Sequence, residues 1–103
     1  MFPSVRVISG SRKPFGYQQI TSLTGVVALT VPTPVNQEAN YCVIQCEGAT
    51  TNIVRWRDDG TNPTTSVGML LFGGQEMDYS GDLNTIRFID SVGSSILNVS
   101  YYT

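Results

Sequence analysis

The segment from Tyr41 to Tyr79 constrains the fold of this chain more than any other. It alternates short runs of β-branched and aromatic residues with breaks of Gly, Asn, Asp and Pro. Each run is shorter than a stable helix requires, and each break is a turn signal. The segment therefore predicts a series of antiparallel strands.

Residues 41–47 show most clearly how such a strand divides its side chains between two faces. Cys42, Ile44 and Cys46 share one face because side chains alternate along a strand. The two cysteines lie about 13 Å apart in an extended strand, which is too far for a disulfide bond between them. We expect reduced thiols that are buried as small hydrophobic residues.

The same pattern recurs along the rest of the chain. Residues 17–31 form an apolar run rich in Thr and Val, which Pro32 and Pro34 end because proline cannot donate to a sheet ladder. The continuous apolar run 67–72 predicts a central strand or one at an interface, and Gly73-Gly74 predicts a hairpin turn after it. The remaining expected strands are 53–58, 75–79, 84–90 and 96–102.

These runs predict an all-β protein. Roughly seven to eight short strands, with turn signals about every 8–12 residues, indicate an antiparallel β-sandwich that is jelly-roll-like or Ig-like. The chain of 103 residues has room for one domain. Residues 1–16 contain two prolines and two glycines, and we expect them to form an extended N-terminal arm that orders against a partner. The sandwich domain is then expected over residues 17–103.

Composition bears on the classes of partner. Only 14% of the residues are charged, against about 25% in an average soluble domain. The net charge is −2, and Lys13 is the single lysine, so no basic patch favours nucleic acid as a partner. No run of about 18 apolar residues predicts a membrane span, and the N-terminus does not resemble a signal peptide. We therefore expect synthesis in a cytoplasm.

The sequence shows no arrangement typical of an enzyme. Histidine is absent, and no phosphate loop, metal-ligand cluster or nucleophile elbow is present. Asp58, Asp59 and Asn62 could offer oxygens to a hard cation, but turn capping explains them better. We expect a non-enzymatic protein without cofactor or metal.

The triplet Arg55-Trp56-Arg57 allows two interpretations. Strand alternation places Trp56 toward the core and both arginines on the opposite face. The arginines then pair with carboxylates on neighbouring strands, or they contact another protein subunit, where the planar guanidinium is favoured.

Tyrosines allow a second alternative, in which exposed rings form a platform for sugars. The candidates Tyr17, Tyr41, Tyr79 and Tyr102 are scattered over different elements, so packing at the core edge or subunit contact is favoured. A carbohydrate- or receptor-binding module remains the alternative, with these tyrosines and the loop 58–62 as its site.

Four segments resemble a group of small virion structural proteins of tailed bacteriophages. They are NYCVIQCEG at 40–48, RWRDDGTNPTTSVGM at 55–69, IRFI at 86–89 and LNVSYY at 97–102, whereas Met1–Thr30 match poorly. The group often has alanine in the strand where this chain has Cys42 and Cys46, which is consistent with small buried residues.

The resemblance implies a virion component assembled in the host cytoplasm. A decoration (cement) protein that binds the major capsid protein is the favoured role, and a neck, collar or tail accessory protein is the alternative. We expect other virion proteins as partners and a homo-oligomer. From the residues themselves, the contacts are expected at Phe2, Arg6, Arg12, Phe15, Arg55, Arg57, Met69 and Leu71.

Overall fold

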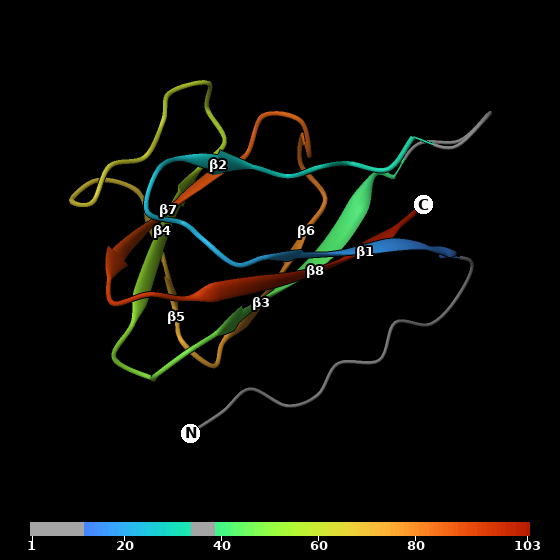
Figure 1. Cartoon of the computed structure of the whole chain (residues 1–103). Helices are drawn as coiled ribbons and strands as arrows, with labels where there is room; N and C mark the ends of the chain where they lie inside the picture. The colour runs from blue at the N-terminus through green and yellow to red at the C-terminus, as the bar shows by residue number, and fades with distance from the viewer. Residues whose placement is uncertain (1–11, 34–38) are drawn as a thin grey trace.

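The computed structural model describes residues 12–33 and 39–103, which form eight β-strands and contain no helix (Figure 1). The predicted all-β fold class is confirmed. The strands are β1 (Pro14–Ile20), β2 (Val27–Ala28), β3 (Tyr41–Glu47), β4 (Ile53–Arg57), β5 (Met69–Phe72), β6 (Glu76–Tyr79), β7 (Arg87–Val92) and β8 (Ile96–Tyr102).

The strands form two four-stranded antiparallel sheets, with the orders β1-β8-β3-β6 and β2-β7-β4-β5. The pairings are nested, because β4 pairs with β5, β3 with β6, β2 with β7 and β1 with β8. The chain is therefore one long hairpin, centred on β4 and β5, that is wound so that its strand pairs fall alternately in the two sheets. This is the topology of a jelly roll, one of the two sandwich types that the sequence predicts.

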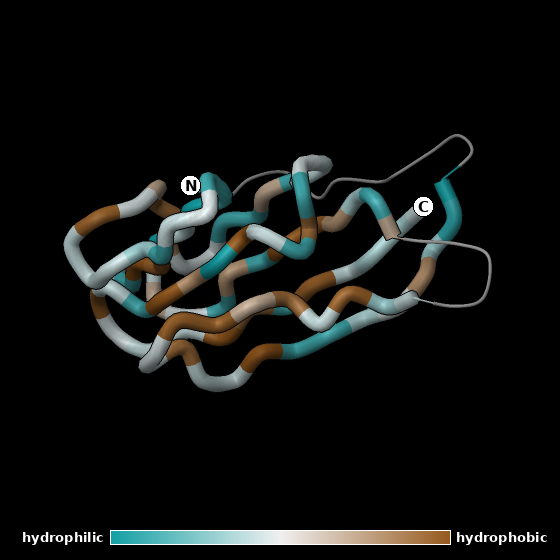
Figure 2. Tube along the Cα trace, turned by 90° about the horizontal axis from the view of Figure 1, so that it is seen from above, coloured by the Kyte–Doolittle hydropathy of each residue, from teal (hydrophilic) through white to brown (hydrophobic). Residues whose placement is uncertain are grey.

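The core lies between the two sheets. Cys42, Ile44 and Cys46 are fully buried on the inner face of β3, as their spacing predicts. Hydrophobic stretches of the chain are interspersed with hydrophilic ones (Figure 2). The other sheet and the neighbouring strand contribute Val54, Leu71, Phe88, Leu97, Val99 and Tyr101 to the same hydrophobic cluster.

Two aromatic residues link the sheets inside the sandwich. Trp56 of β4 and Tyr79 of β6 make an edge-to-face contact with ring centroids 6.2 Å apart. The hydroxyl of Tyr79 donates to Asp58 Oδ2 at 2.8 Å. Trp56 thus faces the core, as strand alternation predicts, and the buried tyrosine retains a polar partner.

Asn52 holds together the turns that follow β3, β5 and β7. Its Nδ2 donates to the carbonyl of Ser94 at 2.9 Å and to the hydroxyl of Ser95 at 3.3 Å. Its own carbonyl accepts from the backbone N–H of Gly73 at 3.1 Å. Each of these turns carries the chain from one sheet to the other (Figure 1). Asn52 thus stabilises three connections between the two sheets.

The turn after β7 requires glycine for two reasons. Gly93 has φ of +74°, a conformation that L residues rarely adopt. A Cβ atom at this position would lie 2.2 Å from Asn52 Oδ1. Close packing around Asn52 therefore limits which residues can replace Gly93 in the turn between β7 and β8.

The structure corrects the expected hairpin at Gly73-Gly74. β5 and β6 belong to different sheets, where they pair with β4 and β3. The sequence predicts a central strand or an interface strand for the run before this turn, and the structure places β5 at the edge of its sheet. Turn chemistry predicts a reversal of the chain, but it does not decide whether the two strands pair.

The boundary between arm and sandwich also differs from the sequence prediction. β1 begins at Pro14, so residues 14–16 belong to a strand. Proline is tolerated at the first position of a strand, and the register of β1 against β8 shifts between Pro14 and Gly16. Residues 1–11 lie outside the described residues.

The first prediction concerns the crossing at Gly93. Gly93→Ala should lower the free energy of unfolding more than Gly60→Ala, because Gly60 has φ of +88° but a Cβ atom added there would meet no heavy atom within 4 Å. The backbone conformation alone costs about 1–2 kcal/mol. Asn52→Ala should cost about 2 kcal/mol through two lost hydrogen bonds.

Denaturant unfolding of the three variants checks this. In the double variant Asn52→Ala with Gly93→Ala, we expect the cost to be smaller than the sum of the single costs, because the contact at Gly93 is relieved. Equal destabilisation by Gly93→Ala and Gly60→Ala would show that close packing against Asn52 is unimportant.

Candidate functional site

Large apolar side chains are exposed along β5 and just before it. Val67, Met69, Leu70 and Phe72 are 50%, 59%, 46% and 36% exposed, respectively. β5 lies at the edge of its sheet. An exposed apolar edge of this kind is a place where another protein can bind.

The outer face of the same sheet extends this apolar region. The register places Phe72 of β5 beside Ile53 of β4, and Ile53 beside Val92 of β7. Val92 is 48% exposed. We call the group the β5 surface, and it comprises Ile53, Val67, Met69, Leu70, Phe72 and Val92.

The main chain of β5 is partly capped at its end. The backbone N–H of Phe72 donates to the Gln75 side-chain oxygen at 2.9 Å, and the carbonyl of Phe72 accepts from the Gln75 N–H at 3.0 Å. These groups are therefore not open to a further strand. The β5 surface offers apolar side chains more than it offers backbone hydrogen bonds.

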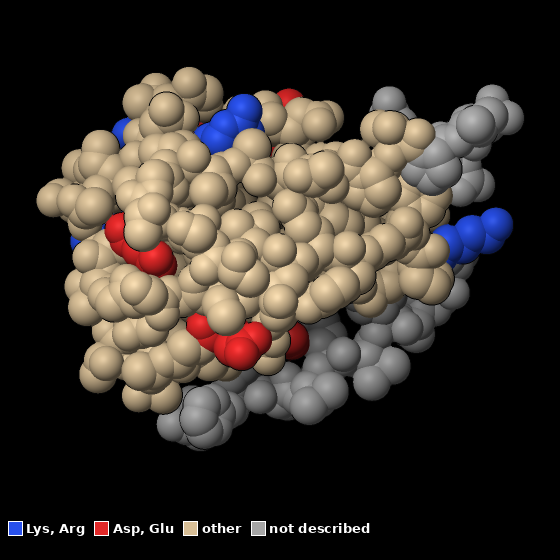
Figure 3. All heavy atoms as spheres, in the orientation of Figure 1, with Lys and Arg blue, Asp and Glu red and all other residues tan. Residues whose placement is uncertain are grey.

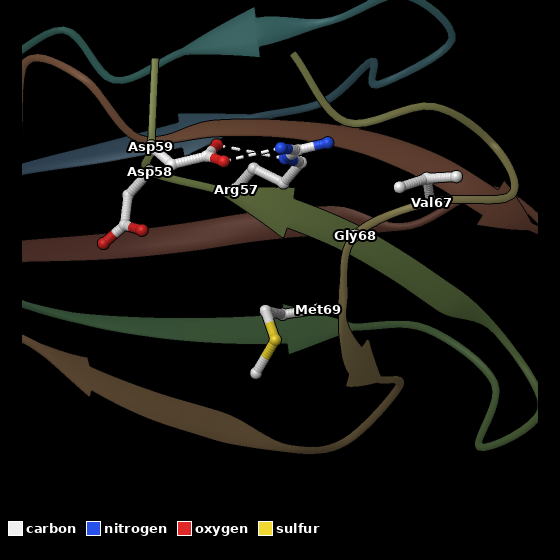
Figure 4. Close-up of a pocket in the computed structure, with 6 residues that line it drawn as sticks. All are labelled: Arg57, Asp58, Asp59, Val67, Gly68 and Met69. Carbon is white, nitrogen blue, oxygen red and sulfur yellow. Dashed lines mark hydrogen bonds and ion pairs between the residues drawn. The ribbon is translucent and has the colours of Figure 1, made fainter. Parts of the chain in front are cut away.

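A pocket of about 290 Å³ lies at the start of β5 (Figure 4). It combines the apolar side chains of the β5 surface with charged groups from the end of β4. The lining residues are Arg57, Asp58, Asp59, Val67, Gly68 and Met69.

The charged groups of this pocket are mostly engaged within the chain. Arg57 Nε donates to Asp59 Oδ1 at 3.0 Å, and Nη2 donates to the second oxygen. These hydrogen bonds lower the pKa of the Asp59 carboxyl to about 2, so it is ionised at neutral pH. Asp58 points away from this pair (Figure 4) and accepts from the hydroxyl of Tyr79. The pocket therefore carries one net negative charge.

Arg55 holds the long loop after β4 against the outer face of the sheet. Its Nε donates to the Ser91 hydroxyl at 3.2 Å, and its Nη1 donates to the Gly68 carbonyl at 3.0 Å. Ser91 in turn donates to the carbonyl of Thr65 at 2.6 Å. The interpretation in which both arginines pair with carboxylates on neighbouring strands is thus wrong, since Arg55 binds a hydroxyl and a carbonyl, and Arg57 binds a carboxylate two residues away. Contact of the two arginines with another subunit stays a prediction.

Of the two contact residues predicted in β5, one is exposed and the other is buried. Leu71 is 4% exposed and lies beside Val54 on the core side of its sheet, so it is not available to a partner. Met69 is exposed, and its contact with a partner stays a prediction. The outward residues of this strand are Leu70 and Phe72. The sequence does not identify them, because a continuous apolar run does not reveal which alternate residues face the core.

The remaining predicted contacts lie near the N-terminus. Arg12 is exposed, with its guanidinium carbon 3.9 Å from the centre of the Tyr41 ring. Phe15 is partly buried and packs against the core. Phe2 and Arg6 lie outside the described residues.

The structure brings part of the alternative sugar platform together, since the rings of Tyr41 and Tyr102 are in contact with centroids 5.9 Å apart, but Tyr79 lies outside it. Tyr79 is only 8% exposed, whereas Tyr17 is 65% exposed on the opposite sheet from the loop 58–62. Tyr17 instead belongs to a polar network around Asn98. The candidates from the sequence do not include Asn98, although its place between the buried residues Leu97 and Val99 marks it as outward-facing.

Comparisons with known proteins find no match among protein-family models, curated proteins or solved structures. Within residues 12–33 and 39–103, no group of acidic and cysteine side chains is arranged to hold a metal ion. The described part of the chain also has no helix that could cross a membrane. Charged side chains are sparse on the face of the molecule shown in Figure 3.

The two cysteines are free and buried, as the sequence predicts. Burial raises the pKa of the Cys42 thiol to about 12, with a further contribution from the charge of Asp78. Burial also raises the pKa of Cys46, although a hydrogen bond with Ser95 opposes the shift. Neither thiol therefore forms the reactive thiolate readily at neutral pH.

The second prediction concerns these thiols. At pH 8, the folded chain should react with a disulfide reagent such as dithionitrobenzoate only as fast as it opens, and both thiols should react at once in denaturant. The released chromophore measures the rate. Rapid reaction of one thiol in native conditions would contradict the burial of β3.

Proposed function

We propose that this chain is a non-enzymatic structural component of a tailed-phage virion. In this role it is a decoration (cement) protein, which binds the major capsid protein through the β5 surface. The exposed apolar β5 surface is the observation that carries the proposal. The resemblance of the segments 40–48 and 55–69 supplies the class of partner.

Several features of the structure support binding as the mode of action. The β5 surface lies beside a loop that is bound to β4, because Arg55 donates to the Gly68 carbonyl and Arg57 donates to Asp59. Burying each large apolar side chain contributes about 1.5–3 kcal/mol when it leaves water completely. Many copies on a repeating lattice would strengthen individually weak contacts.

Other roles within a virion would use the same surface. A neck, collar or tail accessory protein would present it to a different virion protein. A homo-oligomer would bury it between copies of this chain. These alternatives differ in partner and not in the residues that make the contact.

The third prediction tests this surface directly. Phe72→Ser and Leu70→Ser should each weaken binding of the purified chain to particles assembled from the major capsid protein by about tenfold, because each removes an apolar contact of roughly 1.4 kcal/mol. Co-sedimentation with the particles measures the affinity. Both residues face outward, so the thermal transition of each variant should stay close to that of the unchanged chain.

Val26→Ser is the matched control. Val26 is 39% exposed next to β2, at the opposite edge of the same sheet. It should leave binding unchanged. If the unchanged chain does not sediment with the particles, or if all three variants bind equally well, the proposed capsid role is wrong.

A further inference from the structure

A polar network covers part of the outer face of the other sheet. Asn98 of β8 lies at its centre, because the register places Gln19 of β1 on one side and Gln45 of β3 on the other. Tyr17 and Glu47 complete the network. We call these five residues the Asn98 face.

Asn98 uses its full hydrogen-bonding capacity within this face. Its Oδ1 accepts from the Tyr17 hydroxyl at 2.6 Å and from Gln19 Nε2 at 2.9 Å. Its Nδ2 donates to Gln45 Oε1 at 3.1 Å and to Glu47 Oε1 at 2.9 Å. Five side chains from three strands are thereby held in one arrangement before any ligand arrives.

The carboxylate fixes the direction of every hydrogen bond in the network. Glu47 can only accept, so Asn98 must direct its NH₂ group toward it. Gln45 then has to present its oxygen to that NH₂ group, which leaves its own NH₂ group for a ligand. Gln19 must present its NH₂ group to Asn98, which leaves its oxygen for a ligand.

The outward groups match the chemistry of sugar hydroxyls. The face presents the Gln45 NH₂ group as a donor, and it presents the second Glu47 oxygen and the Gln19 oxygen as acceptors. Neighbouring hydroxyls of a sugar can satisfy such a mixture, because each hydroxyl both donates and accepts. The ring of Tyr17 is 65% exposed, and it offers a flat apolar surface for the C–H side of the sugar.

Charge favours a neutral sugar over an anionic one. The outward positions of β3 and β8 include Glu47 but no cation, and Glu76 of β6 lies beside Gln45. The cation Arg12 lies over the ring of Tyr41, at the opposite end of β3 from Glu47. A carboxylate or sulfate on the ligand would be repelled. Side chains that are already ordered also lower the entropic cost of binding.

We propose that the Asn98 face binds neutral glycan chains, with Tyr17 as the stacking residue. This face belongs to the sheet opposite the β5 surface, so it stays accessible when that surface is covered. The proposal does not depend on the capsid role.

The fourth prediction tests this site in the intact chain labelled with ¹⁵N. Maltohexaose, cellohexaose and chitohexaose are titrated separately, and the side-chain amide signals of Gln19, Gln45 and Asn98 are followed by NMR. At least one sugar should shift these signals, with a Kd of about 0.1–10 mM. A hexamer of galacturonic acid should give no shift.

Variants assign the binding to its residues. Tyr17→Ala should weaken it by roughly tenfold or more, whereas Tyr17→Phe should weaken it less, because the ring is retained. Phe72→Ser is the matched control, since it should impair capsid binding and leave sugar binding intact. Tyr17→Ala should impair sugar binding and leave capsid binding intact.

Three results would overturn the proposal. In the first, none of the three sugars shifts the signals at about 10 mM, the upper end of the expected Kd range. In the second, Tyr17→Ala binds as well as the unchanged chain. In the third, the signals shift with protein concentration and not with sugar, which would assign this face to contact between copies of the chain.

Discussion

The nested pairing of the strands requires the chain to cross repeatedly between two sheets. Every connection except the one between β4 and β5 makes such a crossing. Three of these crossings meet at Asn52, whose side chain and carbonyl bind the turns after β5 and β7. Because the core lies between the sheets, its burial depends on crossings that hold the sheets face to face.

Because the two sheets pack face to face, their outer faces lie on opposite sides of the molecule. One, together with its β5 edge, carries the apolar β5 surface, and the other carries the hydrogen-bonded Asn98 face. Strand alternation allows this, because inward residues build a common core while outward residues vary independently. A repeated particle component would use both properties, one to attach and one to meet the surroundings.

Alternation is local, and it predicts β3, β4 and β8 well, whereas the apolar run 17–31 contains only part of β1 and the two residues of β2. Residues 41–47 show this, since spacing alone places their three buried side chains correctly. Alternation does not predict which strands pair, and so the glycines at Gly73-Gly74 suggest a hairpin that the fold does not contain. The continuous apolar run of β5 likewise hides its inward residue, Leu71.

The candidate sites depend on pairing even more strongly. The network around Asn98 joins β1, β3 and β8, which are far apart in the sequence and become neighbours only through the jelly-roll order. Outward polar residues at positions 19, 45 and 98 could be recognised from alternation. Alternation does not reveal which strands are neighbours, so the sequence could not show that these three residues lie side by side.

In the proposed arrangement, one sheet lies against the virion and the other faces solvent. An electron-microscopy reconstruction of the native particle, with the density of this chain identified, tests that placement most directly. We expect the strands β5 and β4 to contact the capsid protein, while Tyr17 and Asn98 face outward. A reconstruction in which the sheet β1-β8-β3-β6 lies against the capsid, or in which the particle contains no such density, would contradict the account.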